Sequence, residues 1–320
     1  MTEQARESSP RRCTANIARP VIVYGCSILM PDLYRRAAEP GIRRAAEPDS
    51  VVLANAATGS VARSLNLLLD QAARLPDLEA LVLLHQDAEL LDTDFASRLR
   101  NAMSDPDVAI VGCVGARGVR DIAWWDGTVT WNSSAYHHAE LGGRQITSPP
   151  VAAPSPGEVD VVYGVVMALS PWAVTHLRFD ESVGMLHGYD FDLCRQARAA
   201  GRRVLAADLR VAHHHSLDLV SEIEIWVGAH MRAAELWDQQ GPGPDSPDEA
   251  WRPRARAAEA AAGAARLLAA SKLLHADASA QRDERELDSI RSSLSWRMTE
   301  PLRRANALRR RLRARGELGD

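Results

Sequence analysis

Short apolar runs alternate with helix-like segments over the first 112 residues, and this alternation constrains the fold more than any other feature. Each apolar run stops at a glycine or a polar residue, and the segments between carry apolar residues at helical spacing. Such alternation predicts βαβ units, and therefore an α/β fold with a mostly parallel sheet and helices on both faces. The predicted strands are 20–26, 50–54, 78–84 and 108–112, and the predicted helices are 60–75 and 92–103.

The pattern is less regular elsewhere. Residues 114–156 are rich in glycine, tryptophan and histidine and are longer than a usual connection, which predicts an irregular functional loop. The sequence RRAAEP occurs twice within 35–48, and its prolines together with Gly41 predict two short turns. The later predicted elements are a strand at 159–169 interrupted by Gly164, helices near Trp172, at 190–200 and at 219–237, and strands near Val204 and Val211.

The composition divides the chain into four segments. A linker rich in glycine, proline and aspartate at 239–249 separates the predicted body from the C-terminal segment. Beyond the linker, an alanine-rich helix of about forty residues is predicted to end near Ser292, and its composition is typical of a coiled coil or a docked arm. We therefore expect a disordered lead-in at 1–19, a body at 20–238, the linker, and a helical arm with a basic amphipathic tail at 250–320.

Charge and cysteine content exclude several classes of protein. Among 38 basic residues Lys272 is the single lysine, which argues against P-loop and Schiff-base enzymes. From Trp251 onward 16 residues are basic and 9 are acidic, so the body is acidic and we expect no nucleic-acid partner. The four cysteines form no C-x-x-C pair, and neither a secretory signal nor an apolar membrane span is apparent. These features predict a cytoplasmic protein.

In a sheet of parallel strands, ligands bind at the carboxyl ends of the strands, which here are 24–27, 55–59 and 85–89. Asp87 directly follows one predicted strand. Its carboxylate could bind a divalent cation shared with a diphosphate, or it could cap the helix that follows, and the segment alone leaves both interpretations open.

Two further clusters carry chemistry. Asp190 and Asp192 lie in the first turn of a predicted helix, where the helix dipole keeps a carboxylate ionised and able to act as a general base. Capping suffices to explain Asp192, whereas Asp190 is freer to meet a substrate. The run 213–215 is three adjacent histidines, of which one or two could ligate an ion, and a polar turn is the alternative.

In their order and spacing these motifs resemble those of family-2 inverting glycosyltransferases of the GT-A fold, in a bacterial branch that has His-Gln-Asp in place of Asp-x-Asp. The resemblance covers residues 20–216. Its motifs are Ser64-Leu-Asn66, LLHQDAEL at 83–90, the pair Trp124-Trp125, RFDE at 178–181, HGYDFDLC at 187–194 with Ala200-Gly201 behind it, and HHHS at 213–216.

The resemblance implies a nucleotide-diphosphate sugar as donor, a carbohydrate or lipid-linked acceptor, and Mg²⁺ or Mn²⁺ as cofactor. It implies that Asp87 binds the cation and the diphosphate, and that Asp190 is the catalytic base. His214 is the favoured further metal ligand because the family motif ends in His-x-Ser. The other predicted donor-site residues are Tyr24, Gly25, Asn55, Asn66 and His85, and the predicted acceptor-site residues are Trp124, Trp125, Gly164, His187 and Tyr189.

Several positions depart from the family pattern, among them Tyr163 before Gly164, where relatives can have Asp-Gly. Asn55 ends the second strand where an aspartate is common, which leaves the identity of the nucleotide base open. His85 replaces the first acid of Asp-x-Asp, and Tyr189 replaces the glutamate that usually precedes the base. These two replacements support a second hypothesis, a non-catalytic GT-A-like module that binds a glycan or acts as a scaffold.

The tail adds a possible site of attachment. Residues 292–304 resemble a C-terminal signature found on bacterial enzymes that build surface polysaccharides. Between 302 and 315, leucines interleave with seven arginines in a basic amphipathic segment that could lie on an anionic membrane at the inner face of the cell. A solvated helix end is the alternative, and a homo-oligomer formed through the arm is another.

Overall fold

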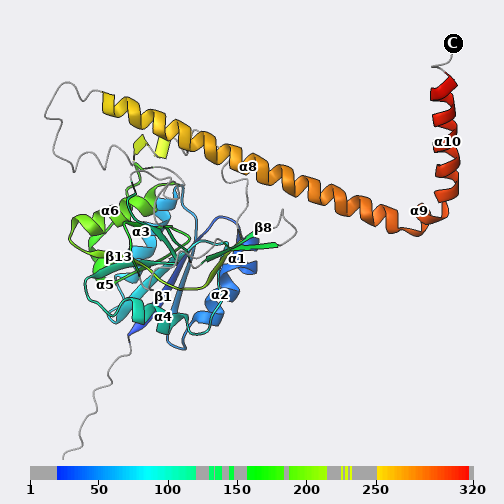
Figure 1. Ribbon diagram of the computed structural model, residues 1–320. Coiled ribbons are helices and arrows are strands. Elements are labelled where there is room, and N and C mark those ends of the chain that lie inside the picture. Colours follow the sequence, from blue (N-terminus) through cyan, green and yellow to red (C-terminus); the bar gives the residue numbers. More distant parts are fainter. Residues whose placement is uncertain are drawn as a thin grey trace, which may run out of the picture.

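The computed structural model describes residues 20–119, 130–132, 134–138, 144–147, 157–183, 187–214, 225, 228–229, 231–232 and 251–316. Figure 1 shows an α/β body from which a long helical arm extends. The predicted lead-in, the linker and most of the predicted helix at 219–237 lie outside the described residues.

A seven-stranded sheet forms the centre of the body, in the order β10-β13-β5-β12-β3-β1-β2. β1 is parallel to β2 and β3, and β5 is parallel to β13. β12 runs antiparallel between β3 and β5, and β10 is antiparallel to β13. The α/β fold with a mostly parallel sheet is therefore confirmed. The strands are β1 (Val21–Ile28), β2 (Val51–Ala56), β3 (Leu78–Leu84), β5 (Val108–Gly112), β10 (Gly157–Glu158), β12 (Val166–Leu169) and β13 (Arg203–Ala206).

Helices cover both faces of this sheet because successive strand residues point to opposite sides. On β1, the Tyr24 ring packs near Phe95, the first residue of α4 (Phe95–Ala102), and its hydroxyl donates to the carbonyl of Ala45 at the end of α2 (Ala38–Ala45). The next residue, Gly25, faces Leu68 of α3 (Val61–Ala72) on the other side. The remaining helices of the body are α1 (Pro31–Arg36), α5 (Pro171–His176) and α6 (Tyr189–Ala199).

The break in the duplicated segment falls at a different place from the predicted one. α1 ends before Ala37, and α2 runs through Pro40 and Gly41. Pro40 is tolerated because it lies in the first turn of α2, where backbone N–H groups have no partner within the helix. Gly41 is required for packing, because a Cβ there would lie 2.4 Å from the backbone nitrogen of Leu90.

The prediction of an irregular loop at 114–156 was wrong in part, because the described residues of that segment contain four short strands. β6 (Val114–Ala116) and β7 (Thr130–Asn132) join β11 (Val161–Val162) in a three-stranded sheet. β8 (Ser134–His138) and β9 (Arg144–Thr147) join a four-stranded sheet in the order β4-β14-β8-β9. The other two strands of that sheet are β4 (Ala88–Leu90) and β14 (Val211–His213), which carry candidate site residues.

The arm consists of α8 (Trp251–Ser292), α9 (Leu294–Met298) and α10 (Glu300–Gly316). α8 ends at the residue predicted from the sequence, where Ser293 accepts a hydrogen bond from the backbone N–H of Trp296 and caps α9. Among the described residues, no helix is both long enough and apolar enough to cross a membrane. Cys26, Cys113 and Cys194 are buried free thiols.

Candidate functional site

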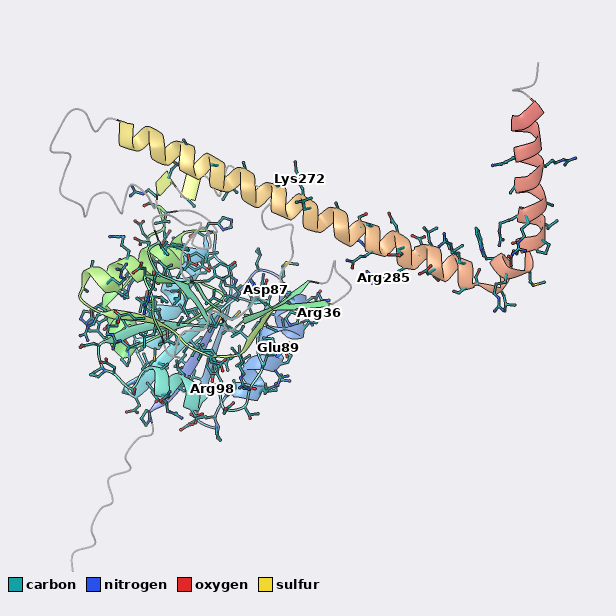
Figure 2. All side chains as sticks on the ribbon, in the orientation of Figure 1. Arg36, Asp87, Glu89, Arg98, Lys272 and Arg285 are labelled. Carbon is teal, nitrogen blue, oxygen red and sulfur yellow. The ribbon has the colours of Figure 1, made fainter. Side chains whose placement is uncertain are left out.

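The candidate site begins where β3 ends at the centre of the sheet. The backbone N–H of His85 donates to the carbonyl of Val165, which joins this end of β3 to the turn before β12. The next side chain, Gln86, points toward β1, and its Oε1 accepts hydrogen bonds from the backbone N–H groups of Leu29 and Met30 at 2.9 and 2.7 Å. These contacts fix the backbone that presents Asp87, which is labelled on the α/β body in Figure 2.

Three side chains converge at this point in a group that could hold a metal ion: His85, Asp87 and His213. One potential ligand atom from each lies within 4.8 Å of those of the other two. His213 Nε2 is 3.3 Å from one carboxylate oxygen of Asp87, and His85 Nδ1 is 3.8 Å from the other. Asp87 is 5% exposed and His213 is 1% exposed, whereas the His85 side chain is half-buried.

His213, and not the predicted His214, lies beside Asp87. β14 pairs antiparallel with β4 so that His213 is opposite Ala88, and successive side chains point to opposite sides of a strand. His214 therefore points elsewhere, and its Nε2 is 2.9 Å from Oε2 of Glu89. Its backbone N–H still donates to the carbonyl of Asp87 at 2.8 Å. His214 thus supports the site through its backbone.

The surroundings of His85 favour the neutral imidazole. Burial lowers its pKa to about 4, with the nearby imidazoles of His213 and His187 acting in the same direction and Asp87 opposing them. A neutral imidazole keeps a lone pair for a metal ion, because a protonated ring has none. The chemistry of His85 thus fits a ligand role.

A second, buried carboxylate lies nearby at the start of α6. Asp190 is 4% exposed, and its two oxygens accept hydrogen bonds from the backbone N–H groups of Gly164 at 2.8 Å and Phe191 at 3.0 Å. Burial raises the pKa of Asp190 to about 6 although these hydrogen bonds favour the ionised form. A carboxylate with this pKa can both accept and release a proton near neutral pH.

Tyr189 connects the two groups. Its hydroxyl oxygen is 2.6 Å from Nε2 of His85, and its ring lies edge-on to Phe179. Burial raises the pKa of Tyr189 well above its ordinary value, and the negative charges of Asp190 and Asp87 add to the effect. Tyr189 therefore stays protonated. Its hydroxyl contacts His85 of the His85–Asp87–His213 group, and Asp190 is the next residue in the sequence.

Asp192 has the structural contacts expected of it. It is 1% exposed, and its carboxylate accepts hydrogen bonds from Arg195 at 2.6 Å and from Gln196 at 2.6 Å, both one turn further along α6. Side chains of its own helix engage both oxygens of Asp192, which is a structural role, whereas the hydrogen bonds to Asp190 come from the backbone N–H groups of Gly164 and Phe191.

Several other predicted donor-site residues have structural contacts. Tyr24 is fully buried, and core leucines surround the position of a Cβ on Gly25, so both contribute to the core, and their contact with a donor stays a prediction. The Asn66 side-chain amide donates to the carbonyl of Phe179 and accepts from its backbone N–H. These two hydrogen bonds connect α3 to the segment before α6. Asn55, at the end of edge strand β2, donates to Gln71 at 3.0 Å.

The predicted acceptor residues are placed only in part. Gly164 and Tyr189 lie at the site, and a Cβ on Gly164 would lie 2.3 Å from the Tyr189 hydroxyl. His187 is half-buried beside Gly188, the residue that directly precedes α6 and has a φ of 82°. Trp124 and Trp125 lie outside the described residues, so their role stays a prediction.

Sequence reasoning missed a charged cluster next to the site. Glu89 on β4 accepts a hydrogen bond from Arg44 of α2 and interacts with His214. Burial alone would raise its pKa, but these two partners outweigh burial and lower it. No local pattern pairs Glu89 with Arg44 or with His214, because these partners lie 45 and 125 residues away in sequence.

Comparisons with known proteins place this arrangement in a family. Residues 45–234 match the model of the family described as "Glycosyltransferase like family". The chain is 29% identical over 202 residues to "Streptomycin biosynthesis protein StrF" of Streptomyces griseus, which covers 61% of this chain and 67% of that protein.

Two solved structures are also similar, at low scores. A mannosyltransferase from Pyrobaculum calidifontis, solved with GDP-Man and Mn²⁺, gives a TM-score of 0.45 at 16% identity over 88% of this chain and 83% of the other. GalNAc-T7, solved with UDP, GalNAc and Mn²⁺, gives 0.41 at 12% identity over 76% and 55%. The assignment to a family rests on the match over residues 45–234, which span more than half of the chain. The chain belongs to the glycosyltransferase-like family.

Proposed function

We propose that this protein is a metal-dependent inverting glycosyltransferase that moves a sugar from a nucleotide-diphosphate sugar to a hydroxyl acceptor. The observation that carries the proposal is the pairing of two groups at the end of β3. A His-Asp-His cluster, in which Asp87 and His213 are buried, lies next to Tyr189, and the residue after that tyrosine, Asp190, is a buried carboxylate with a raised pKa. One group suits a cation with a diphosphate, and the other suits a general base.

The donor set of the cluster fits a divalent cation. Asp87 offers carboxylate oxygens, and His85 and His213 offer imidazole nitrogens. This mixture favours Mn²⁺ over Mg²⁺, because Mg²⁺ prefers an environment made of oxygen ligands and water. When bound, the cation supplies positive charge that stabilises a departing diphosphate.

The chain's own residues then account for the transfer. Asp190 accepts the proton of the acceptor hydroxyl, and the hydroxyl oxygen bonds to the anomeric carbon on the face opposite the diphosphate. The bond between that carbon and the diphosphate oxygen breaks as the new bond forms, so the anomeric centre inverts. The backbone N–H groups of Gly164 and Phe191 hold the Asp190 carboxylate in place for the proton transfer.

We further infer where the enzyme acts. The basic tail and the resemblance of its signature support a role in bacterial surface polysaccharide or glycoconjugate synthesis at the cytoplasmic face of a membrane. The similarity to a protein named for streptomycin biosynthesis makes a small-molecule acceptor a second candidate. An assay of acceptors should therefore include both lipid-linked glycans and soluble hydroxyl compounds.

The test is nucleotide release from a panel of nucleotide sugars with Mn²⁺ or Mg²⁺, and calorimetry of nucleotide binding. We expect Mn²⁺-dependent release, loss of metal-dependent binding in Asp87→Ala, and a greater loss in His213→Ala than in His214→Ala. Release from no sugar nucleotide, together with retained glycan binding, would support a non-catalytic module. Equal losses in the two histidine variants would contradict the ligand assignment.

A further inference from the structure

The two positions that replace family acids, His85 and Tyr189, are far apart in sequence but touch in the structure. The Tyr189 hydroxyl oxygen lies 2.6 Å from Nε2 of His85, and the two ring centroids are 6.5 Å apart. Tyr189 is 5% exposed, so water competes little for this hydrogen bond. The replacements are therefore one interacting pair that spans β3 and α6.

This contact determines which nitrogen of His85 faces the cluster. Because Nε2 is engaged by Tyr189, Nδ1 is the nitrogen directed toward Asp87, at 3.8 Å from Oδ1. Nδ1 can ligate a cation only when the ring proton is on Nε2, since a neutral imidazole has one N–H and one lone pair. The Tyr189 oxygen is in position to accept that Nε2–H.

The local backbone is built to admit this tyrosine. A Cβ on Gly164 would lie 2.3 Å from the Tyr189 hydroxyl and 2.8 Å from the ring carbon that bears it. At the same time the Gly164 N–H holds Asp190 at 2.8 Å. Gly164 thus leaves the space into which Tyr189 reaches His85, while its backbone positions the adjacent carboxylate.

We propose that Tyr189 is a positioning residue that orients His85 and holds its ring proton on Nε2, so that Nδ1 completes the cation site with Asp87 and His213. A hydrogen-bond partner on the far nitrogen is the usual way in which a protein fixes a ligating histidine, and loss of such a partner costs about 10- to 100-fold in metal affinity. His85 and Tyr189 together then do what a carboxylate does at this place in relatives with Asp-x-Asp. The inference rests on the proposed function.

The experiment measures Mn²⁺ affinity of the full-length protein by calorimetry, with no donor or acceptor present. Tyr189→Phe keeps the ring and removes the hydroxyl, and we expect Mn²⁺ affinity to fall about 10- to 100-fold. Gly164→Ala keeps the hydroxyl but displaces it, and we expect a loss of the same order. The matched control is Gly112→Ala, which crowds Val162 in the core with a Cβ at 2.6 Å and should lower the melting temperature without this loss of affinity.

A second readout separates positioning from general damage. In the metal-free protein, ¹⁵N spectra of the histidine rings report which nitrogen of His85 is protonated. We expect Tyr189→Phe to change the His85 signals and to leave those of the exposed His176 unchanged. Wild-type protein that binds no Mn²⁺ would overturn the metal role and this inference with it. Wild-type binding with undiminished affinity in Tyr189→Phe would overturn this inference alone.

Discussion

The carboxylate of Asp190 is the residue on which the proposed chemistry depends most directly. We predict that Asp190→Asn lowers turnover by about 10²- to 10⁴-fold, the usual contribution of general base catalysis, because the amide cannot accept the proton. Donor binding measured by calorimetry should persist, since the substitution leaves Asp87 and His213 in place. Asp192→Asn is the control, because loss of its bonds with Arg195 and Gln196 should chiefly lower the melting temperature. An exchange of these two phenotypes would contradict the assignment.

The raised pKa of Asp190 also predicts a pH dependence. Since the base must be ionised, the rate should increase as pH rises through about 6 and then level off. The stability effect has the opposite sign. Protonated Asp190 is favoured in the folded chain, so its contribution to the free energy of unfolding is greatest at low pH and is lost as pH rises through about 6. Single-turnover rates measured between about pH 4.5 and 8 test the predicted rise in rate, and the Asp190→Asn variant should show no such rise near pH 6.

Single residues mark how far sequence reasoning reaches. Asp87 and Asp190 could be selected because each follows a predicted boundary of a strand or helix. The choice between His213 and His214 could not be made, because it depends on where β14 ends and on its pairing with β4. The contact between His85 and Tyr189 depends on two segments 104 residues apart, and no local pattern encodes it.

At the scale of elements, the packing of α2 against β4 sets the position of the segment that follows Asp87. We predict that Gly41→Ala destabilises the protein by about 1 to 3 kcal/mol, the usual cost of overpacking, because the added Cβ would lie 2.4 Å from the backbone nitrogen of Leu90. Backbone atoms cannot rotate away as a side chain could, so α2 or β4 must shift. Thermal and urea unfolding measure the loss.

The control for this prediction is Gly228→Ala, also in a helix. A Cβ at that position would meet no heavy atom within 4 Å, and alanine has the higher helix propensity, so stability should be unchanged or slightly higher. Equal stability of the Gly41 and Gly228 variants would mean that α2 and β4 have room that the structure does not show.

Elements were predictable where their pattern is local. The apolar runs of β3 and β5 form strands that have a neighbouring strand on each side, and their predicted bounds match the structure. The strands within 114–156 were missed because each is only three to five residues long and depends on partners elsewhere, as β8 does on β14. Short strands have too few residues to show an alternating pattern, so tertiary pairing decides them.

At the scale of the whole molecule, the arm differs from the body in charge and in surface. Its last two helices expose large apolar side chains that would be buried in a core, with Leu294 77% and Met298 76% exposed. Arginines flank them, and the Arg303 guanidinium lies 3.7 Å from the centroid of the Trp296 ring. Apolar side chains interleaved with cations suit the interface of an anionic bilayer, where both kinds of group find partners.

We therefore predict that the full-length protein sediments with vesicles that contain anionic lipid and is released as salt rises, whereas a chain truncated after Pro242 stays in solution and still binds its donor. Near an anionic surface each arginine contributes about 1 kcal/mol, so replacing Arg309 and Arg310 with glutamine should weaken binding by about 2 kcal/mol, or roughly 30-fold.

Arg282→Gln with Arg285→Gln is the charge-matched control. Those two arginines lie on α8 among four acidic residues at 283–288, where the local charge is not positive, so their loss should change binding little. If both pairs have the same effect, net charge alone causes the attraction. If the full-length protein does not bind anionic vesicles but is a dimer in analytical ultracentrifugation, the exposed apolar side chains of α9 and α10 pack against a second chain. The membrane role would then be wrong.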